Sequence, residues 1–304
     1  MRRVIIDTDP GVDDVLAILM LMSSPDISIE AITTVAGNVT VEAATRNAVA
    51  VTDWADYQTE VVAGSPKPLS RLLELATIHG EDGLSGLSSS LQSVDYSDLA
   101  VKKLLELVNK YPHEIELLAI GPLTNVARAI QVDSETMSTL KSLVVLGGAL
   151  EVGGNTNQVA EFNFYTDPEA AKIVLSSKLP ITMVPLDRCY EAVVPMDIFE
   201  KLPSQLKNFC QSLLRPYMLR QQKEEGVSGL VIYDALAAGV LSCPEMGCYQ
   251  SLSLSVNTTD DDQRGALIFD NSGRSKIRVM KTVDVTWFTK IVQARLASLD
   301  SFRY

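Results

Sequence analysis

The stretch that decides the fold is Val4-Ile5-Ile6-Asp7-Thr8-Asp9-Pro10-Gly11-Val12-Asp13-Asp14-Val15-Leu16-Ala17-Ile18-Leu19. Its first three residues are typical of a short buried strand, and Pro10-Gly11 of the turn that ends it. Residues 15–19 then begin a helix. A strand, an acidic turn and a helix in this order indicate the first unit of an α/β protein.

This turn places four carboxylates, Asp7, Asp9, Asp13 and Asp14, within eight residues. The amides at a helix N-terminus favour negative charge at Asp13 and Asp14 but offset only part of the mutual repulsion. Either some of these groups are protonated in the fold, or a cation lies among them. One Asp that ends a strand and one that caps a helix would account for only two of the four. We therefore predict a metal or substrate site here.

The composition excludes several classes of protein. The chain has 304 residues, of which 46% are hydrophobic and 21% charged, as expected for a globular protein with a sizeable core. A net charge of −12 disfavours nucleic acid and anionic membranes as partners. No apolar run approaches the roughly 20 residues that span a bilayer. The N-terminus is too short for a signal peptide, so we expect a cytoplasmic protein.

Cysteine and histidine are too few and too scattered for a zinc site. The cysteines are Cys189, Cys210, Cys243 and Cys248, without a C-x-x-C pair, and the histidines are His79 and His113. A disulfide framework has no support either. The remaining metal ligands are hard oxygens, which suit Ca²⁺ or Mg²⁺.

Strand and helix patterns alternate along most of the chain. This alternation predicts one domain over residues 1–304, with an open, mostly parallel (mixed) sheet and helices on both faces. The predicted strands are Val4–Asp7, Ile29–Val35, Glu60–Ala63, Glu116–Ile120, Ser142–Leu146 and Ile181–Val184, and the predicted helices are Asp13–Met22, Val41–Ala55, Leu99–Asn109, Leu123–Ile130 and Pro168–Ser176.

The C-terminal part has a different pattern. Three strand candidates, two polar turns and a last helix follow one another at Ser251–Val256, Thr258–Arg264, Gly265–Phe269, Asn271–Ser275, Lys276–Val279 and Val285–Leu296. The run Asp260–Asp262 is predicted to be a solvated hairpin tip, since like charges in a turn usually face water.

Glycine and polar residues follow the predicted strands at Gly37-Asn38, Gly121-Pro122-Leu123-Thr124-Asn125, Gly147-Gly148 and Pro185-Leu186-Asp187. In open α/β sheets, ligands bind outside the carboxyl ends of the strands. We expect these segments to share one rim with the N-terminal aspartates.

Further segments bring polar groups that fit this rim. They contain Asn38, His79, the stretch from Asn155 to Asn163 with Glu161, and Asp234 after Tyr233. Each residue also has a structural interpretation when it is taken alone, such as a helix cap for Asp234 or a loop residue for Asn155. His113 is interpreted as a surface residue.

Together these motifs resemble the inosine–uridine-type nucleoside hydrolase family. The resemblance is carried by Asp-Thr-Asp-Pro-Gly-Val-Asp-Asp at residues 7–14, Ala160-Glu161-Phe162-Asn163 and, in family order, Gly37-Asn38, His79-Gly80, Gly121 to Asn125, Gly147-Gly148, Asp167-Pro168-Glu169-Ala170-Ala171 and Asp234. It implies a single α/β domain, a homodimer or homotetramer, and hydrolysis of ribonucleosides to free base and ribose in nucleoside salvage.

The resemblance also implies the roles of individual residues. Ca²⁺ would be held by Asp9, Asp14, Asp234 and the main-chain carbonyl of Ile120. Asp13 and Asn38 would bind the ribose diol, and Asn155, Glu161, Asn163 and His79 the 5′ side of the sugar. Asp9 would take a proton from the attacking water, and Asp7 would orient the loop.

This chemistry agrees with the residue types. Cleavage of an N-ribosidic bond passes through an oxocarbenium-like sugar, which a carboxylate-rich pocket stabilises. One position departs from the pattern: many members carry His just before the last metal aspartate, where it protonates the departing base, and this chain has Tyr233. A phenol is a weaker acid than imidazolium, so Tyr233 is either a catalytic residue at the leaving base or a packing residue.

Two alternatives remain open at this point. A haloacid-dehalogenase-like, Mg²⁺-dependent phosphatase also has D-x-D after an N-terminal strand, and a nucleoside- or ribose-binding protein without activity would retain the same pocket. The sequence does not reveal the preferred base. Leu75–Gly86 and Arg215–Tyr233 are the segments expected to contact it.

Overall fold

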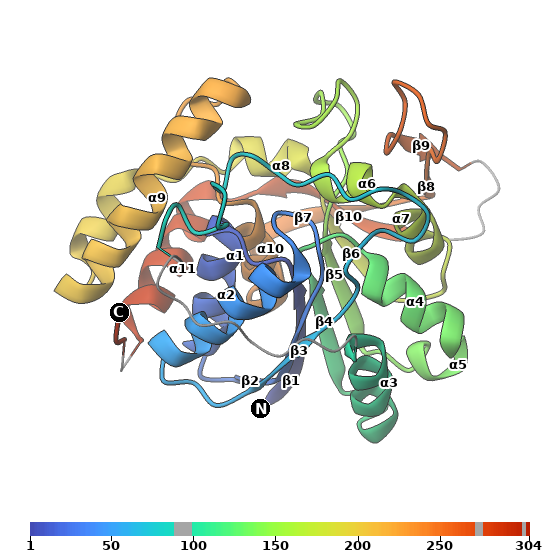
Figure 1. The fold of residues 1–304 in the computed structure, drawn as a ribbon, viewed down its shortest axis with the longest axis horizontal. Coiled ribbons are helices and arrows are strands. Elements are labelled where there is room, and N and C mark those ends of the chain that lie inside the picture. Colours follow the sequence, from blue (N-terminus) through green and yellow to red (C-terminus); the bar gives the residue numbers. More distant parts are fainter. Residues whose placement is uncertain (88–98, 271–275, 300–301) are drawn as a thin grey trace.

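An eight-stranded sheet in the order β3-β2-β1-β4-β5-β6-β10-β7 forms the centre of the computed structural model (Figure 1). The structure describes residues 1–87, 99–270, 276–299 and 302–304. Seven strands run parallel, and β7 pairs antiparallel with β10 at one edge. The strands are β1 (Arg2–Thr8), β2 (Ile27–Thr34), β3 (Glu60–Ala63), β4 (Ile115–Ala119), β5 (Ser142–Leu146), β6 (Ile181–Val184), β7 (Gly247–Leu252) and β10 (Ile277–Val283). This confirms the predicted mixed, mostly parallel sheet in a single α/β domain.

Helices cover both faces of the sheet because its strands are apolar on both sides. In β1, Val4 and Ile6 belong to one buried core and Ile5 to the other. The first core is covered by α1 (Val12–Met22), α2 (Val41–Trp54), α9 (Ser204–Glu224), α10 (Tyr233–Ser242) and α11 (Val285–Ala297). The second is covered by α3 (Ala100–Lys110), α4 (Thr124–Val132), α5 (Ser134–Met137) and α7 (Pro168–Leu175).

Helix α1 is the most enclosed of these elements: all eleven of its residues are buried, and it packs against α10. A helix that is apolar on every side needs such a position. The two acidic residues of its first turn, Asp13 and Asp14, are therefore also buried.

The strand order changes direction at β1. The chain adds β2 and β3 on one side of β1 and then adds β4, β5 and β6 on the other. At such a switch point the loops that follow the strands diverge and leave a crevice at the carboxyl edge of the sheet. The acidic turn after β1 lies at this edge.

The C-terminal part differs from the prediction in one respect. The single strand predicted over Ser251–Val256 is wrong, because β7 ends at Leu252 and β8 (Leu254–Val256) leaves the main sheet to pair with β9 (Leu267–Phe269). Residues 251–256 are strand-like throughout, and the segment is divided only because its two parts pair with different strands. The predicted turn Asn271–Ser275 lies outside the described residues.

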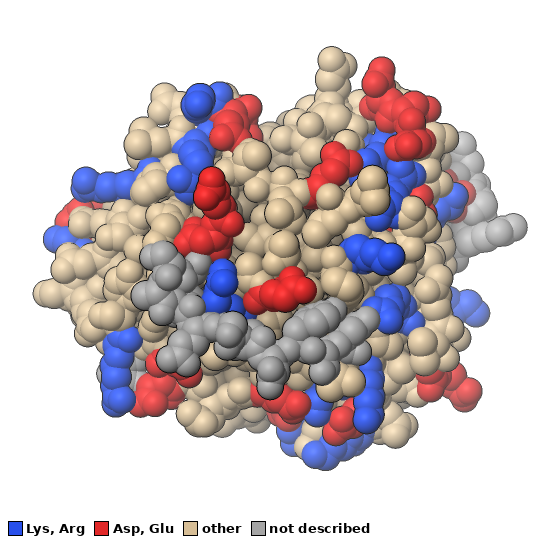
Figure 2. Space-filling view, in the orientation of Figure 1, with Lys and Arg blue, Asp and Glu red and all other residues tan. Residues whose placement is uncertain are grey.

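The loop between β8 and β9 carries the second acidic run, Asp260–Asp262. These residues are exposed, as predicted, and acidic side chains gather over this part of the surface (Figure 2). His113 is also exposed.

The remaining elements are short. They are α6 (Phe162–Thr166), α8 (Leu186–Glu191) and the 3₁₀ helices Met196–Lys201 and Pro244–Met246. Helix α9 was not predicted, since it is the least apolar of the long helices and contains Pro216. No helix among the described residues is both long and apolar enough to cross a membrane.

Candidate active site

Asp7 lies one residue before the end of β1 and is held by side chains of two neighbouring segments. Its Oδ1 accepts hydrogen bonds from Thr33 Oγ1 at 2.6 Å and Asn125 Nδ2 at 2.8 Å. Burial raises the pKa of Asp7 to about 6, although these hydrogen bonds act in the opposite direction. Asp7 thus links the acidic turn to β2 and to the segment after β4.

Asp9 occupies a space that two glycines leave open. A Cβ at Gly37 would lie 2.1 Å from Asp9 Oδ2, and one at Gly121 would lie 2.7 Å from Oδ1. The Asn38 amide donates to Oδ2 at 2.6 Å. Oδ1 is buried and has no hydrogen-bond partner among the described residues. The glycines predicted at the rim are therefore required by the Asp9 carboxylate.

Asp13, Asp14 and Asp234 form a buried cluster. One oxygen from each lies within 4.8 Å of the others, although Asp234 comes from the first turn of α10, far along the chain. The Asp234 amide donates to Asp13 Oδ2 at 3.4 Å, and the side chains of Asp14 and Asp234 are hydrogen-bonded to each other. The three side chains come from the first turns of two helices that pack together.

Hydrogen-bond donors surround Asp14. The Gly11 amide donates to Oδ2 at 2.9 Å, Asn38 Nδ2 donates to the same oxygen at 3.1 Å, and Thr8 Oγ1 donates to Oδ1. These donors favour the ionised form and partly offset the effect of burial.

The buried carboxylates of this cluster repel one another unless protons or a cation neutralise part of their charge. Burial, followed by the charge of Asp14, raises the pKa of Asp13 to about 8. The same causes, in the same order, raise the pKa of Asp9 well above its usual range. The partnerless Oδ1 of Asp9 and an all-oxygen donor set fit a hard divalent cation such as Ca²⁺ or Mg²⁺. The residues present therefore fit a metal site.

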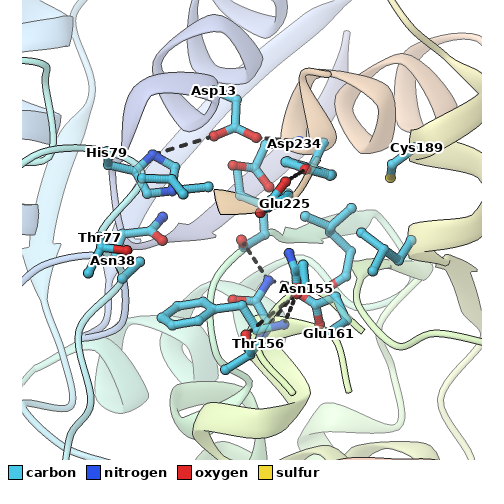
Figure 3. Close-up of a pocket in the computed structure, with 18 of the residues that line it drawn as sticks. Asp13, Asn38, Thr77, His79, Asn155, Thr156, Glu161, Cys189, Glu225 and Asp234 are labelled. Atoms are coloured by element: carbon cyan, nitrogen blue, oxygen red, sulfur yellow. Dashed lines mark hydrogen bonds and ion pairs between the residues drawn. The ribbon is translucent and has the colours of Figure 1, made fainter. Parts of the chain in front are cut away.

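A cavity of about 220 Å³ adjoins the cluster (Figure 3). Of the predicted site residues, all except Asp9 and Asp14 line it, namely Asp13, Asn38, His79, Ile120, Asn155, Glu161, Asn163, Tyr233 and Asp234. Asp9 and Asp14 lie against its wall through their hydrogen bonds to Asn38. The structure thus brings the predicted residues together.

The segment before α6 supplies one wall of the cavity. Glu161 caps α6 and accepts from the amides of Asn163, at 2.8 Å, and Gly148, at 3.1 Å. Asn163 Nδ2 donates to the Ile120 carbonyl at 3.1 Å, and both residues line the cavity. Burial raises the pKa of Glu161 to about 7. The wall offers both donors and acceptors to a polyhydroxylated ligand.

His79 faces the cluster from the loop before the first undescribed segment. Its Nδ1 accepts the Val12 amide at 3.0 Å, which leaves the proton of the neutral ring on Nε2. Burial and the charge of Arg220 lower the pKa of His79 to about 3. The ring stacks on Tyr217, with 5.2 Å between centroids. His79 is therefore neutral near pH 7.

Contacts with α9 hold this loop in place. Arg220 donates to the Ile78 carbonyl and to Ser85 Oγ, and Thr77 Oγ1 donates to Glu224 Oε2 at 2.5 Å. Both segments expected to contact the base, Leu75–Gly86 and Arg215–Tyr233, contribute residues to the cavity.

Sequence reasoning predicted the segments that contain Thr77, Glu224 and Glu225 but did not single out these residues, and it missed Cys189. Glu225 follows α9, and the Tyr233 hydroxyl donates to its Oε2. Thr77, Cys189 and Glu224 also line the cavity. Glu225 follows another Glu at the end of a polar helix, so no local signal distinguishes it; only the packing of α9 over the site brings it there.

Comparisons with known proteins agree over almost the whole chain. The model of the inosine-uridine preferring nucleoside hydrolase family matches residues 4–290. Uridine nucleosidase 1 of Arabidopsis thaliana is 35% identical over 313 residues, which cover 97% of this chain and 93% of the relative. A pyrimidine-specific ribonucleoside hydrolase of Escherichia coli K12 is 31% identical over 301 residues, with 96% of each chain covered.

A solved structure agrees in fold. The purine-preferring ribonucleoside hydrolase from Gardnerella vaginalis superposes with a TM-score of 0.90 at 27% identity, covering 98% of this chain and 99% of its own. These matches decide against the phosphatase and non-catalytic alternatives. The chain belongs to the inosine-uridine preferring nucleoside hydrolase family and is an N-ribosyl hydrolase.

Proposed function

We propose that this enzyme hydrolyses ribonucleosides to free base and ribose, with Asp9 as the general base and a calcium ion in the aspartate cluster. The observation that carries the proposal is the convergence of buried carboxylates from both halves of the chain on one cavity, with Asp9 Oδ1 left without a partner. Carboxylates so placed stabilise positive charge that develops at C1′ of the sugar.

The ligands of the ion would be Asp9, Asp14, Asp234 and the Ile120 carbonyl. Support comes from the contact between Asp14 and Asp234, from the raised pKa of Asp9, and from the place of Ile120 in the lining of the same cavity. When bound, such an ion lowers the pKa of a coordinated water and orients the ribose hydroxyls.

Asp9 would take the proton of the attacking water. Among the described residues its carboxylate accepts a hydrogen bond from the Asn38 amide at Oδ2 and none at Oδ1, so it keeps lone pairs both for the ion and for the proton of the water. Gly37 and Gly121 fit closely around the carboxylate and hold it in one orientation. A base held this way loses little entropy in the reaction.

The remaining polar residues would bind the sugar. Asp13 and Asn38 would hold the 2′- and 3′-hydroxyls, next to the cluster. The 5′ side would meet Asn155, Glu161, Asn163 and the Nε2–H of His79. Asp13 is suited to accept from a diol, because it lines the cavity and its Oδ1 has no hydrogen-bond partner among the described residues.

Tyr233 would lie at the leaving base. Its ring meets that of Tyr190 edge-on, with 6.3 Å between centroids, and its hydroxyl donates to Glu225. The relatives include pyrimidine-specific and purine-preferring enzymes, so the family alone does not decide the base.

We also propose that residues 1–304 form one domain that assembles into a homodimer or homotetramer in the cytoplasm. Analytical ultracentrifugation of the purified chain measures the assembly directly. A monomer at micromolar concentration would contradict this part of the proposal.

One panel of substrates tests the proposed function. Purified enzyme is incubated with inosine, adenosine, uridine and cytidine, with and without EDTA, and ribose release is measured as reducing sugar. We expect hydrolysis of at least one nucleoside, its loss in EDTA, and its recovery when excess Ca²⁺ is added. Undiminished ribose release in EDTA would overturn the metal assignment. Phosphate release from 4-nitrophenyl phosphate, with all nucleosides untouched, would overturn the function.

A further inference from the structure

Two acidic residues of the cavity, Glu224 and Glu225, have no role in the proposed mechanism, and Glu225 is the less exposed of the two. It directly follows α9, lines the cavity, and accepts a hydrogen bond from the Tyr233 hydroxyl (Figure 3). The Asn155 side chain is hydrogen-bonded to it from the opposite wall. Two partners from different segments thus hold its carboxyl group in one place.

Glu225 lies in the part of the cavity that the proposed function assigns to the base. The aspartate cluster and Asn38 occupy one part of the lining, and Glu161 and Asn163 another, and both are assigned to the sugar. Glu225 comes from the end of α9 and is hydrogen-bonded to Tyr233, which is assigned to the departing base, and to Asn155, which is assigned to the 5′ side of the sugar. Glu225 therefore lies beside the place assigned to the departing base, between the Tyr233 hydroxyl and the Asn155 side chain.

Its surroundings favour the protonated carboxyl. Burial raises the pKa of Glu225 to about 7, while the hydrogen bonds from Tyr233 and Asn155 act in the opposite direction. None of the described residues that line the cavity is Lys or Arg. The titratable groups that face it are Glu224 on its own segment, Tyr217 on α9, Tyr233 on α10, Tyr190 on α8 and Glu161 at the start of α6.

Other candidates for a proton donor are excluded. His79 is neutral near pH 7, and its Nδ1 already accepts the Val12 amide. Burial raises the pKa of Tyr190 and of Tyr233 above their usual value, so both hydroxyls are weak acids. Both oxygens of Glu161 are occupied by main-chain amides of Asn163, Gly148 and Phe164. A carboxylic acid whose pKa lies near neutral pH is the stronger donor for a departing base.

We propose that Glu225 is the general acid of this enzyme and that Tyr233 and Asn155 position it. The inference rests on the proposed hydrolysis. As the C1′–N bond breaks, its electron pair goes to the base, which takes the proton of the Glu225 carboxyl. The water oxygen bonds to C1′ and its proton passes to Asp9. Afterwards Asp9 releases that proton to solvent and Glu225 takes one up, so the products are ribose and the neutral base.

The test compares leaving groups that differ in their need for a proton. Ribonucleosides need one, whereas 4-nitrophenyl β-D-ribofuranoside departs as a stable phenolate. In calcium-loaded Glu225→Gln, kcat for the best ribonucleoside should fall about 100-fold or more, the usual range for general acid catalysis. Turnover of the nitrophenyl riboside should fall by less than about fivefold. The retained turnover also shows that the variant folds and binds the sugar.

Glu224→Gln is the matched control. This neighbouring Glu also lines the cavity but is bonded to Thr77. Whatever its effect on turnover, the effect should be the same for both kinds of substrate, because no proton transfer is lost.

The pH profile supplies a second readout. Wild-type kcat/KM for ribonucleosides should decline above about pH 7 as Glu225 loses its proton, and Glu225→Gln should lack this alkaline limb. Tyr233→Phe removes a hydrogen bond that lowers the pKa of Glu225, so the limb should move to higher pH.

Equal losses on both substrates in Glu225→Gln, or an unchanged alkaline limb, would overturn the inference. If the wild-type enzyme hydrolyses neither substrate, the proposed function itself has failed. The two failures are therefore distinguishable.

Discussion

Two runs of aspartates in this chain have opposite environments. The residues of the first, Asp7 to Asp14, lie at the carboxyl edge of the sheet and are 0–2% exposed. Those of the second, Asp260–Asp262, lie on the loop between β8 and β9, where the Asp260 side chain is 86% exposed. Sequence composition alone would treat the runs alike.

The titration of the two runs differs in direction. Burial and the charge of Asp14 raise the pKa of Asp13 to about 8. In the second run, hydrogen bonds from Thr259 and Gln263 lower the pKa of Asp261. Gathered carboxylates thus indicate a binding site only where water is excluded, because only there does repulsion remain unscreened. The position of a run relative to the sheet edge decides which case applies.

The largest expected effect is that of Asp9→Asn. Without its general base, kcat should fall about 10³- to 10⁴-fold in steady-state assays of ribose release, close to the upper limit for such catalysis. In metal-free buffer the variant should also unfold at higher urea concentration than wild type, since one buried charge has been removed. Asp261→Asn is the control and should retain full turnover. A loss of less than tenfold in Asp9→Asn would show that another group activates the water.

The second effect concerns metal affinity. Asp14→Asn should weaken Ca²⁺ binding about 100-fold or more, because loss of even an indirect partner of a metal ligand costs 10- to 100-fold. Calorimetric titration with Ca²⁺ measures the affinity of both single variants. Asp261→Asn should bind Ca²⁺ as tightly as wild type does, because its residue belongs to the exposed run. Equal affinities in wild type and Asp14→Asn would place the ion elsewhere.

The third effect is on stability as a function of pH, with opposite signs for the two runs. The folded pKa of Asp7 is about 6, above its ordinary value of 3.8, so its contribution is fully present below about 3.8 and is lost as pH rises through 6. The loss is about 1–3 kcal/mol at 1.36 kcal/mol per unit. The folded pKa of Asp261 is lowered, so its contribution is present at neutral pH and is lost as pH falls through that pKa.

Urea unfolding between pH 3 and pH 8, in EDTA, measures both contributions. Asp7→Asn should become more stable relative to wild type as pH rises from 4 to 7. Asp261→Asn should be less stable than wild type at neutral pH, and this difference should disappear as pH falls. The same slope for both variants would remove the distinction between the two runs.

The sequence predicted what short-range patterns determine. Asp9 and Asp14 follow a buried strand in a turn of distinctive composition, and parallel strands bring Asn38 and Ile120 to the same edge whatever their distance along the chain. The six parallel strands predicted from the first two thirds of the chain lie within two residues of their predicted limits. Periodicity and turn chemistry were sufficient for this part of the site.

The sequence did not predict what tertiary packing alone determines. Glu225 reaches the cavity because α9, a polar helix with Pro216 in it, packs over α1. Asn47 Nδ2 donates to the Pro10 and Asp82 carbonyls, which joins the acidic turn to the His79 loop without any sequence motif. The end of the cavity proposed for the base is assembled from such long-range contacts. Local sequence patterns therefore do not predict which base the enzyme prefers.

The smallest expected effect belongs to Asp260→Asn. Asp260 Oδ1 lies 2.8 Å from Arg71 Nη1, but the carboxylate is in water and Arg71 keeps a second, multiply hydrogen-bonded partner in Glu169. An exposed pair of this kind contributes at most about 1 kcal/mol. Turnover should be unchanged and the urea midpoint nearly so, with any difference disappearing in 1 M salt. A large loss of stability that persists in salt would mean that the loop between β8 and β9 depends on its acidic residues as strongly as the active site does, and exposure would then no longer separate the two runs.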